Sequence, residues 1–83
     1  MRRTVMTKTG ETDDRYTVTA TLRNAVRSPC RSDGAYVIYG DVYGDIRGWF
    51  MDGQEIRTSI VVHEEGDLVR TLNSLYRIEG EIT

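Results

Sequence analysis

The chain has 83 residues, of which 39% are hydrophobic and 29% charged, and its formal net charge is −2. This length predicts a single domain with a thin core, because such a chain buries only about 60 to 65% of its unfolded surface. A deep catalytic cavity would compete with that core for apolar side chains, so we expect a binding surface and not an enzyme. No apolar run approaches the roughly 20 residues of a membrane-spanning helix.

The beginning of the chain, MRRTVMTKTGETDD, lacks the apolar segment of a secretory signal, which predicts a cytoplasmic protein. The single cysteine, Cys30, has no partner for an internal disulfide, in agreement with a reducing compartment. Cys30 and the single histidine, His63, cannot supply the four ligands of a structural zinc site. We therefore expect no metal, no cofactor and no contact with a membrane.

Charge is unevenly distributed along the chain. Residues 1–31 contain seven Lys or Arg and three acidic residues, whereas residues 32–83 contain four and ten. A basic N-terminal arm could contact nucleic acid or an acidic protein face, although a solvated tail explains it as well. We expect residues 1–14 to be this polar arm, frayed or forming a short edge strand over Thr4–Thr7, and residues 15–83 to form a single β domain.

The first strand is expected from Tyr16 onward, where YTVTATLRN alternates strictly between apolar and polar residues. A period of two with β-branched residues is typical of a half-buried strand. The stretch RSPCRSDG, residues 27–34, contains the only proline and predicts a loop.

A long alternating run follows over residues 35–50, with apolar residues and glycines at even positions. The next three residues, MDG, predict a hairpin loop with Gly53 at positive φ. That loop would place Phe50 opposite Gln54 and Val42 opposite Val62, with Gly48, Ile46 and Gly44 facing Ile56, Thr58 and Ile60.

The three glycines of YGDVYGDIRGWFMDG lie four residues apart, and we interpret them as structural, in a strand that bends strongly. Their spacing fits neither a dinucleotide-binding fingerprint nor a phosphate-binding loop, and the stretch lacks the acidic pattern of an EF-hand. In a strand, Asp41 and Asp45 would lie about 13 Å apart, too far to chelate one ion or to form a catalytic pair.

Further strands are expected over Ile56–Val62 and on either side of a turn at Asn73–Ser74. We therefore predict an all-β fold, a small antiparallel sheet of about five strands curled into a barrel or sandwich. The core should also receive Leu68, Leu72, Leu75, Tyr76 and Ile78 from the C-terminal strands. The main predicted core residues are Val18, Leu22, Ile38, Val42, Ile46, Phe50, Ile56, Ile60 and Val62.

The stretches VYGDIRGWFMDGQEIRTSIV and RTLNSLYRI resemble a pattern found in small uncharacterised proteins of phages and prophages. This resemblance covers residues 42–78. It carries no established activity and no functional residue, and it implies only a setting, a phage-type protein that acts inside a bacterial host.

The odd-numbered face of the long run combines aromatic and charged side chains. Such residues are enriched at interface hot spots, so we expect a protein partner there, such as a host enzyme or defence complex that is inhibited, or a second copy in a homodimer. The alternatives are a small barrel that binds single-stranded nucleic acid by stacking and a structural component of an oligomer. Aspartates among the aromatic residues favour a basic protein surface over nucleic acid. The candidate partner-binding residues are Tyr39, Asp41, Tyr43, Asp45, Arg47 and Trp49.

Overall fold

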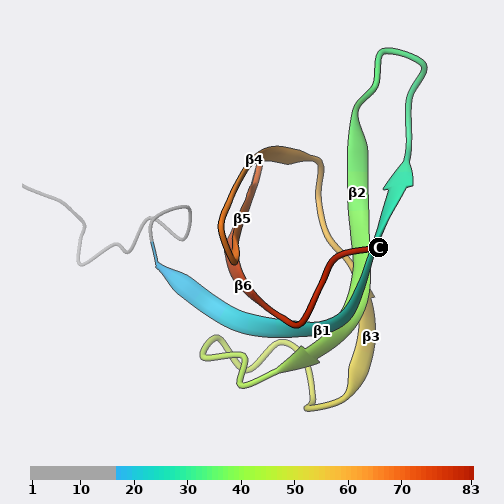
Figure 1. The fold of residues 1–83 in the computed structure, drawn as a ribbon. Helices are drawn as coiled ribbons and strands as arrows, with labels where there is room; N and C mark the ends of the chain where they lie inside the picture. Colours follow the sequence, from blue (N-terminus) through green and yellow to red (C-terminus); the bar gives the residue numbers. More distant parts are fainter. Residues whose placement is uncertain (1–16) are drawn as a thin grey trace, which may run out of the picture.

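The computed structural model describes residues 17–83, so the expected N-terminal arm lies outside the described residues. Within residues 17–83 the chain forms six β-strands and no helix (Figure 1), which confirms the all-β prediction. The strands are β1 (Val18–Pro29), β2 (Tyr36–Tyr43), β3 (Gln54–Arg57), β4 (Val61–Glu65), β5 (Leu68–Thr71) and β6 (Leu75–Glu79).

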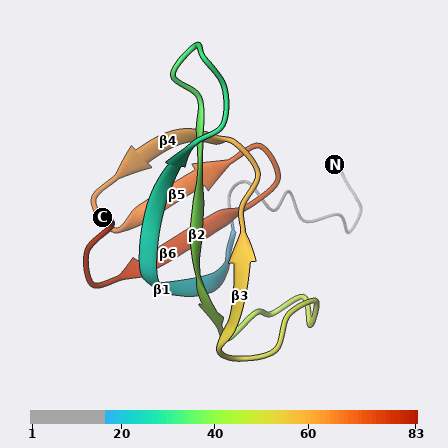
Figure 2. The ribbon, with the colours of Figure 1, turned by 90° about the vertical axis from the view of Figure 1, so that its right-hand side faces the viewer.

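The strands form one mixed sheet in the order β3-β2-β1-β6-β5-β4. The central strand β1 runs antiparallel to β2 but parallel to β6, while the other neighbouring pairs are antiparallel. The sheet curls so strongly that β4, at one edge, faces β2 across the interior (Figures 1 and 2). The sheet is not closed, however, so it is neither a barrel nor a sandwich. Over residues 17–83 it has six strands and one parallel pair, whereas about five antiparallel strands were predicted.

A β-bulge in β1 gives the sheet part of its curl. Arg23 is opposite Asp41 and Val26 is opposite Tyr39, so β1 has one more residue than β2 over this stretch. Asn24 adopts a φ of 57°, a left-handed conformation that Asn tolerates better than most residues. A side chain at Gly40 would place its Cβ 3.2 Å from the backbone oxygen of Arg23. Gly40 is therefore the strand glycine that allows two backbones to approach closely.

The core lies on the concave side of the sheet. Leu22, Ile38, Val42 and Ile56 are buried as predicted, and Phe50 packs against them while remaining partly exposed. The buried cluster also contains Ala20, Ala25, Val69, Tyr76 and Ile78.

Three predicted core residues are exposed instead. Ile46 is 70% exposed, Val62 52% and Leu72 55%. Val18 and Ile60 are half-buried. The errors fall where a strand ends earlier than predicted or where its register shifts, because a shift of one residue moves a side chain to the other face.

The predicted hairpin between residues 50 and 54 is wrong. β2 ends at Tyr43, and Gly40 lies opposite Ile56 while Val42 lies opposite Gln54. Residues 44–53 consequently form a ten-residue loop, which we call the 44–53 loop. Gly53 has the predicted positive φ, at 85°, but it closes this longer loop by donating its backbone N–H to the carbonyl oxygen of Val42 at 2.7 Å.

The predicted strand over Ile56–Val62 is two strands, β3 and β4. The Thr58 N–H donates to the Ile38 carbonyl oxygen at 2.9 Å, and the Thr58 hydroxyl oxygen accepts the Ile38 N–H at 3.0 Å. Two residues later, the Ile60 carbonyl oxygen accepts the Leu72 N–H at 3.0 Å. The chain therefore leaves β2 and joins β5 within three residues. The strands predicted around Asn73–Ser74 are confirmed as β5 and β6.

Candidate functional site

The 44–53 loop projects from one end of the sheet, opposite the β1–β2 connection (Figure 2). Its first residue, Gly44, has a φ of 64° and donates its N–H to the Asp52 carboxylate at 2.8 Å. The Ile46 N–H donates to the Thr19 carbonyl oxygen at 2.8 Å, which ties the loop to β1. Gly48 supplies a second positive φ, of 72°. The loop is thus fixed at both ends and in its middle.

Asp45 organises the inside of this loop. Its carboxylate accepts the backbone N–H groups of Arg47, Trp49 and Phe50 at 3.2, 2.8 and 3.1 Å, and its side chain is fully buried. Burial favours the neutral acid, but the three N–H donors and the Arg47 guanidinium outweigh it and hold the pKa of Asp45 below its ordinary value. Asp45 is therefore a structural carboxylate and is not available to a partner.

Arg47 is also mostly buried, with 10% of its side chain exposed. Its guanidinium donates to the Ser74 hydroxyl oxygen at 2.8 Å and lies 3.4 Å from an Asp45 carboxylate oxygen. The same guanidinium stacks on Trp49, with 3.9 Å from its carbon to the ring centroid. Arg47 therefore positions the indole ring, because the cation and the π face attract one another.

The loop exposes three large apolar side chains to solvent. Trp49 is 64% exposed, Ile46 70% and Met51 79%. These are the largest exposed fractions among the large hydrophobic residues of the described chain. Single exposed apolar residues need no explanation, but several on one ordered loop are typical of a surface that binds a partner.

The predicted site residues are separated by the end of β2. Tyr39, Asp41 and Tyr43 lie on β2, where Tyr39 is 39% exposed and the other two are half-buried. Asp41 accepts a hydrogen bond from the Asn24 side chain at 2.9 Å, and the Arg23 guanidinium lies 4.3 Å from the Tyr43 ring centroid. The expectation of one continuous strand face is wrong, because Asp45, Arg47 and Trp49 belong to the loop.

Two exposed loop residues were not among the predicted site residues. Ile46 was assigned to the core because it continues the even-numbered apolar face, and Met51 was treated only as part of a turn. A usable signal was present in Gly44 and Gly48, since glycines on both sides of an apolar residue indicate a loop as readily as a bent strand.

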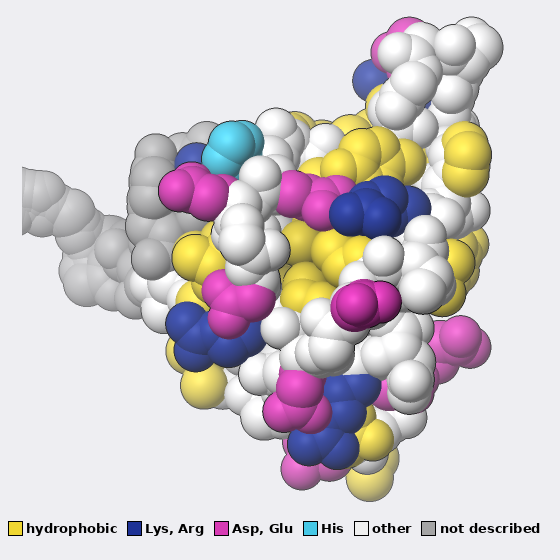
Figure 3. Space-filling model, viewed as in Figure 1, with side chains coloured by type: hydrophobic (Ala, Val, Ile, Leu, Met, Phe, Trp, Pro, Cys, Tyr) yellow, Lys and Arg dark blue, Asp and Glu magenta, His cyan; other side chains and the backbone are white. Residues whose placement is uncertain are grey.

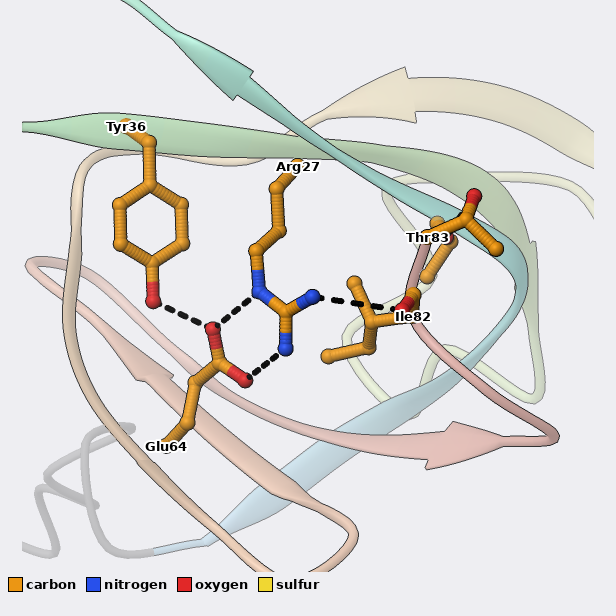
Figure 4. A network of polar contacts seen from close by, with 6 residues as sticks. Arg27, Tyr36, Glu64, Ile82 and Thr83 are labelled. Carbon is orange, nitrogen blue, oxygen red and sulfur yellow. Dashed lines mark hydrogen bonds and ion pairs between the residues drawn. The ribbon is translucent and has the colours of Figure 1, made fainter.

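A second polar cluster lies across the open side of the sheet (Figure 4). Arg27 of β1 donates from Nε and Nη2 to the two carboxylate oxygens of Glu64 of β4, at 2.9 and 2.8 Å. Its Nη1 donates to the Ile82 carbonyl oxygen at 3.2 Å. The Tyr36 hydroxyl donates to the same carboxylate. These bonds join β4, whose only neighbour in the sheet of residues 17–83 is β5, to β1, β2 and the C-terminal segment.

The pKa values in this cluster follow from its hydrogen bonds. The Arg27 guanidinium lowers the pKa of Glu64, and the Tyr36 hydroxyl bond acts in the same direction. Burial raises the pKa of Tyr36, as does its bond to Glu64. Hydrophobic side chains gather among the charged ones on the face of the molecule shown in Figure 3. We interpret this cluster as stabilising the fold and not as a binding site, because its donors and acceptors are already paired with each other.

Other kinds of site find little support within residues 17–83. This part of the chain contains no group of three or more His, Cys, Asp or Glu residues that could hold a metal ion. Cys30 is a free, exposed thiol in the β1–β2 connection. Residues 17–83 contain no helix with the length and apolar character needed to span a membrane.

The fold and the loop together define a small all-β protein with an open, curled six-stranded sheet and one apolar loop. Comparison with known proteins adds no relationship to this description. No protein-family model matches the chain, no curated protein is significantly similar to it, and no solved structure matches it significantly.

Proposed function

We propose that the protein is a small binding module that engages a protein partner through the 44–53 loop. The observation that carries this proposal is the exposure of Ile46, Trp49 and Met51 on a loop whose backbone is fixed by the buried Asp45. A fixed loop loses little conformational entropy on binding, and Trp is among the residues that dominate interface energies. The resemblance to phage-type proteins supports a bacterial host protein as the partner, with inhibition of that protein as the outcome.

Single-stranded nucleic acid is the weaker candidate. A stacking platform needs free aromatic faces, but Arg47 occupies one face of Trp49 and Arg23 lies over Tyr43. Residues 17–83 also contain seven arginines against ten acidic residues, a balance that repels a polyanion.

The proposal is tested by affinity capture from a bacterial lysate with quantitative mass spectrometry. Wild-type protein and the Trp49→Ala variant are compared with Val62→Ala, which removes a 52% exposed apolar side chain from β4. We expect proteins that are retained by wild type and by Val62→Ala but reduced at least tenfold with Trp49→Ala. Equal capture by all three proteins would place the binding surface elsewhere.

Self-association is examined on the same variants by sedimentation velocity. If wild type and Val62→Ala sediment as dimers and Trp49→Ala as a monomer, the partner at the loop is a second copy of this chain. Circular dichroism must show the same β content for all three. Because Trp49 is mostly exposed, its truncation should change the free energy of unfolding by no more than about 1 kcal/mol.

A further inference from the structure

Two hollows of opposite charge lie on the surface of the described residues. The larger, about 360 Å³, is lined by Arg27 together with the acidic residues Glu64, Asp67 and Glu81. The smaller, about 150 Å³, lies between the 44–53 loop, the Thr58–Ser59 segment and the Asn73–Ser74 turn. Two arginines line it and no carboxylate does. The smaller hollow is therefore suited to an anionic group.

Arg57 sets the charge of this smaller hollow. The other arginine, Arg47, is neutralised by Asp45 and held by Ser74. Arg57 is exposed at the end of β3, and within residues 17–83 it has neither an ion pair nor a side-chain hydrogen bond. A guanidinium has five N–H donors in a planar fork, which matches the two oxygens of a carboxylate.

Further donors line the same hollow. Within residues 17–83, the side-chain amide of Asn73 makes no hydrogen bond. The bonds from Asn73 to Ser59 and Thr71 are donated by its backbone N–H. The Ser59 and Ser74 hydroxyl oxygens accept bonds from Asn73 and Arg47, which leaves each hydroxyl hydrogen free to donate. The smaller hollow thus offers several hydrogen-bond donors to an anionic group, which can only accept hydrogen bonds.

We propose that this hollow binds a carboxylate side chain of the protein partner, an Asp or Glu of an acidic segment, with Arg57 as its counter-ion. The inference rests on the proposed function and deepens it, because the exposed indole of Trp49 lines the same hollow. An apolar residue next to the partner's acidic residue would then contact Trp49. The expectation of a basic partner surface is revised, since Asp45 is buried and Asp41 is bonded to Asn24.

An acidic peptide fits the surroundings better than nucleic acid does. A hollow of about 150 Å³ admits a carboxylate with its methylene groups but not a nucleotide base and sugar. Beyond the hollow, the exposed Asp52 and Glu55 would repel the successive phosphates of a strand. A single carboxylate that inserts beside Arg57 avoids that repulsion.

The test is an NMR titration of the full ¹⁵N-labelled chain with two tripeptides, acetyl-Leu-Glu-Leu-amide and its neutral match acetyl-Leu-Gln-Leu-amide. The observed signals are the Arg57 Nε–H, the Asn73 side-chain amide and the Trp49 indole N–H. Arg57→Gln removes the counter-ion. Arg31→Gln is the matched control, because Arg31 is an exposed arginine that pairs with Asp33 in the distant β1–β2 connection.

We expect the Glu peptide to shift these signals and to bind at least tenfold more tightly than the Gln peptide. Arg57→Gln should weaken binding of the Glu peptide at least tenfold, and Arg31→Gln less than twofold. Equal affinities for the two peptides, or no shifts at about 10 mM Glu peptide, where even a millimolar Kd would be evident, would overturn the proposal.

An octathymidylate is titrated as a third probe. If it shifts the same signals at lower concentration than the Glu peptide, the hollow is a nucleic-acid site and the carboxylate proposal is wrong. The lysate experiment remains independent of these results. If capture from the lysate depends on Trp49 but the two peptides bind equally, the proposal that the 44–53 loop binds a partner stands. Only the proposed preference for an acidic partner is then rejected.

Discussion

At the scale of single residues, Asp45 has the largest local effect in the candidate site. One carboxylate accepts three backbone N–H groups from a stretch that has no partner strand. It also neutralises Arg47, which in turn supports Trp49. The exposure of the apolar side chains on a fixed loop therefore depends on a buried acid that itself touches no partner.

The first prediction concerns Asp45→Ala. This change leaves three N–H groups without their acceptor, so we expect it to lower the free energy of unfolding by about 1 to 3 kcal/mol in urea titrations. Glu55→Ala is the control, because Glu55 is exposed, and its loss should stay within about 0.5 kcal/mol. Hydrogen exchange at the Trp49 and Phe50 amides should accelerate in Asp45→Ala alone. Unchanged exchange there would show that other contacts hold the loop.

At the scale of elements, the open side of the sheet is joined by side chains where backbone pairing stops. β1 and β4 are far apart in the sheet order, yet Arg27 and Glu64 connect them with two parallel hydrogen bonds. Both side chains keep some solvent exposure, 43% and 20%, so salt should weaken the pair.

The second prediction is the pH dependence of stability. Because the pKa of Glu64 is lower in the folded protein than in the unfolded chain, the unfolded chain takes up the proton first as the pH falls. This contribution to stability is complete well above the pKa of Glu64 in the unfolded chain, about 4.3. It is lost as the pH drops through the lower pKa of Glu64 in the folded protein. The pKa of Asp45 is also lowered in the folded protein, so Asp45 adds to the loss of stability at low pH.

Urea titrations of wild type and Glu64→Gln between about pH 6 and pH 3 measure this effect. The variant should be less stable near neutral pH, and its stability should fall less steeply with acid, with up to one proton fewer taken up on unfolding. Asp67→Asn is the control, an exposed acidic residue paired with Arg77 at the β4–β5 turn. Identical pH profiles for wild type and Glu64→Gln would show that the ion pair does not close the sheet.

Elements set by local patterns could be predicted from the sequence, whereas those set by distant contacts could not. The alternation of residues 17–23 predicted β1, and the Asn73–Ser74 turn was placed correctly, because both patterns are local. The end of β2 was missed, since Ile46 and Phe50 continue an even-numbered apolar pattern within the loop. The break at Thr58 was missed because it depends on a hydrogen bond to Ile38, twenty residues away.

The candidate site was also predictable only in part, because local patterns mark its region of the chain but not the contacts within it. Aromatic residues next to charged ones drew attention to the right region of the chain, and Trp49 is exposed there. Whether Asp45 faced a partner or the inside of a loop depended on its three backbone contacts. Arg57 and Asn73 meet at the smaller hollow only because the sheet curls, so local sequence patterns could not pair them.

At the scale of the whole molecule, a thin core makes each buried side chain important. The third prediction compares two isoleucines that the alternation assigned to the same face. Ile38 is fully buried and Ile46 is 70% exposed. Ile38→Ala should lower the free energy of unfolding by about 2 to 5 kcal/mol, whereas Ile46→Ala should change it by less than about 0.5 kcal/mol. Chemical denaturation measures both, and similar losses would mean that Ile46 belongs to the core after all.

Site-specific photo-crosslinking in bacterial cells tests most directly whether the molecule binds its partner with the 44–53 loop, as we propose. Met51→p-benzoylphenylalanine places the crosslinker on the loop while keeping Trp49, and Val62→p-benzoylphenylalanine places it on the exposed face of β4. We expect a discrete crosslinked protein from position 51, abolished by adding Trp49→Ala, and none from position 62. A crosslinked protein from position 62 with none from position 51 would contradict it.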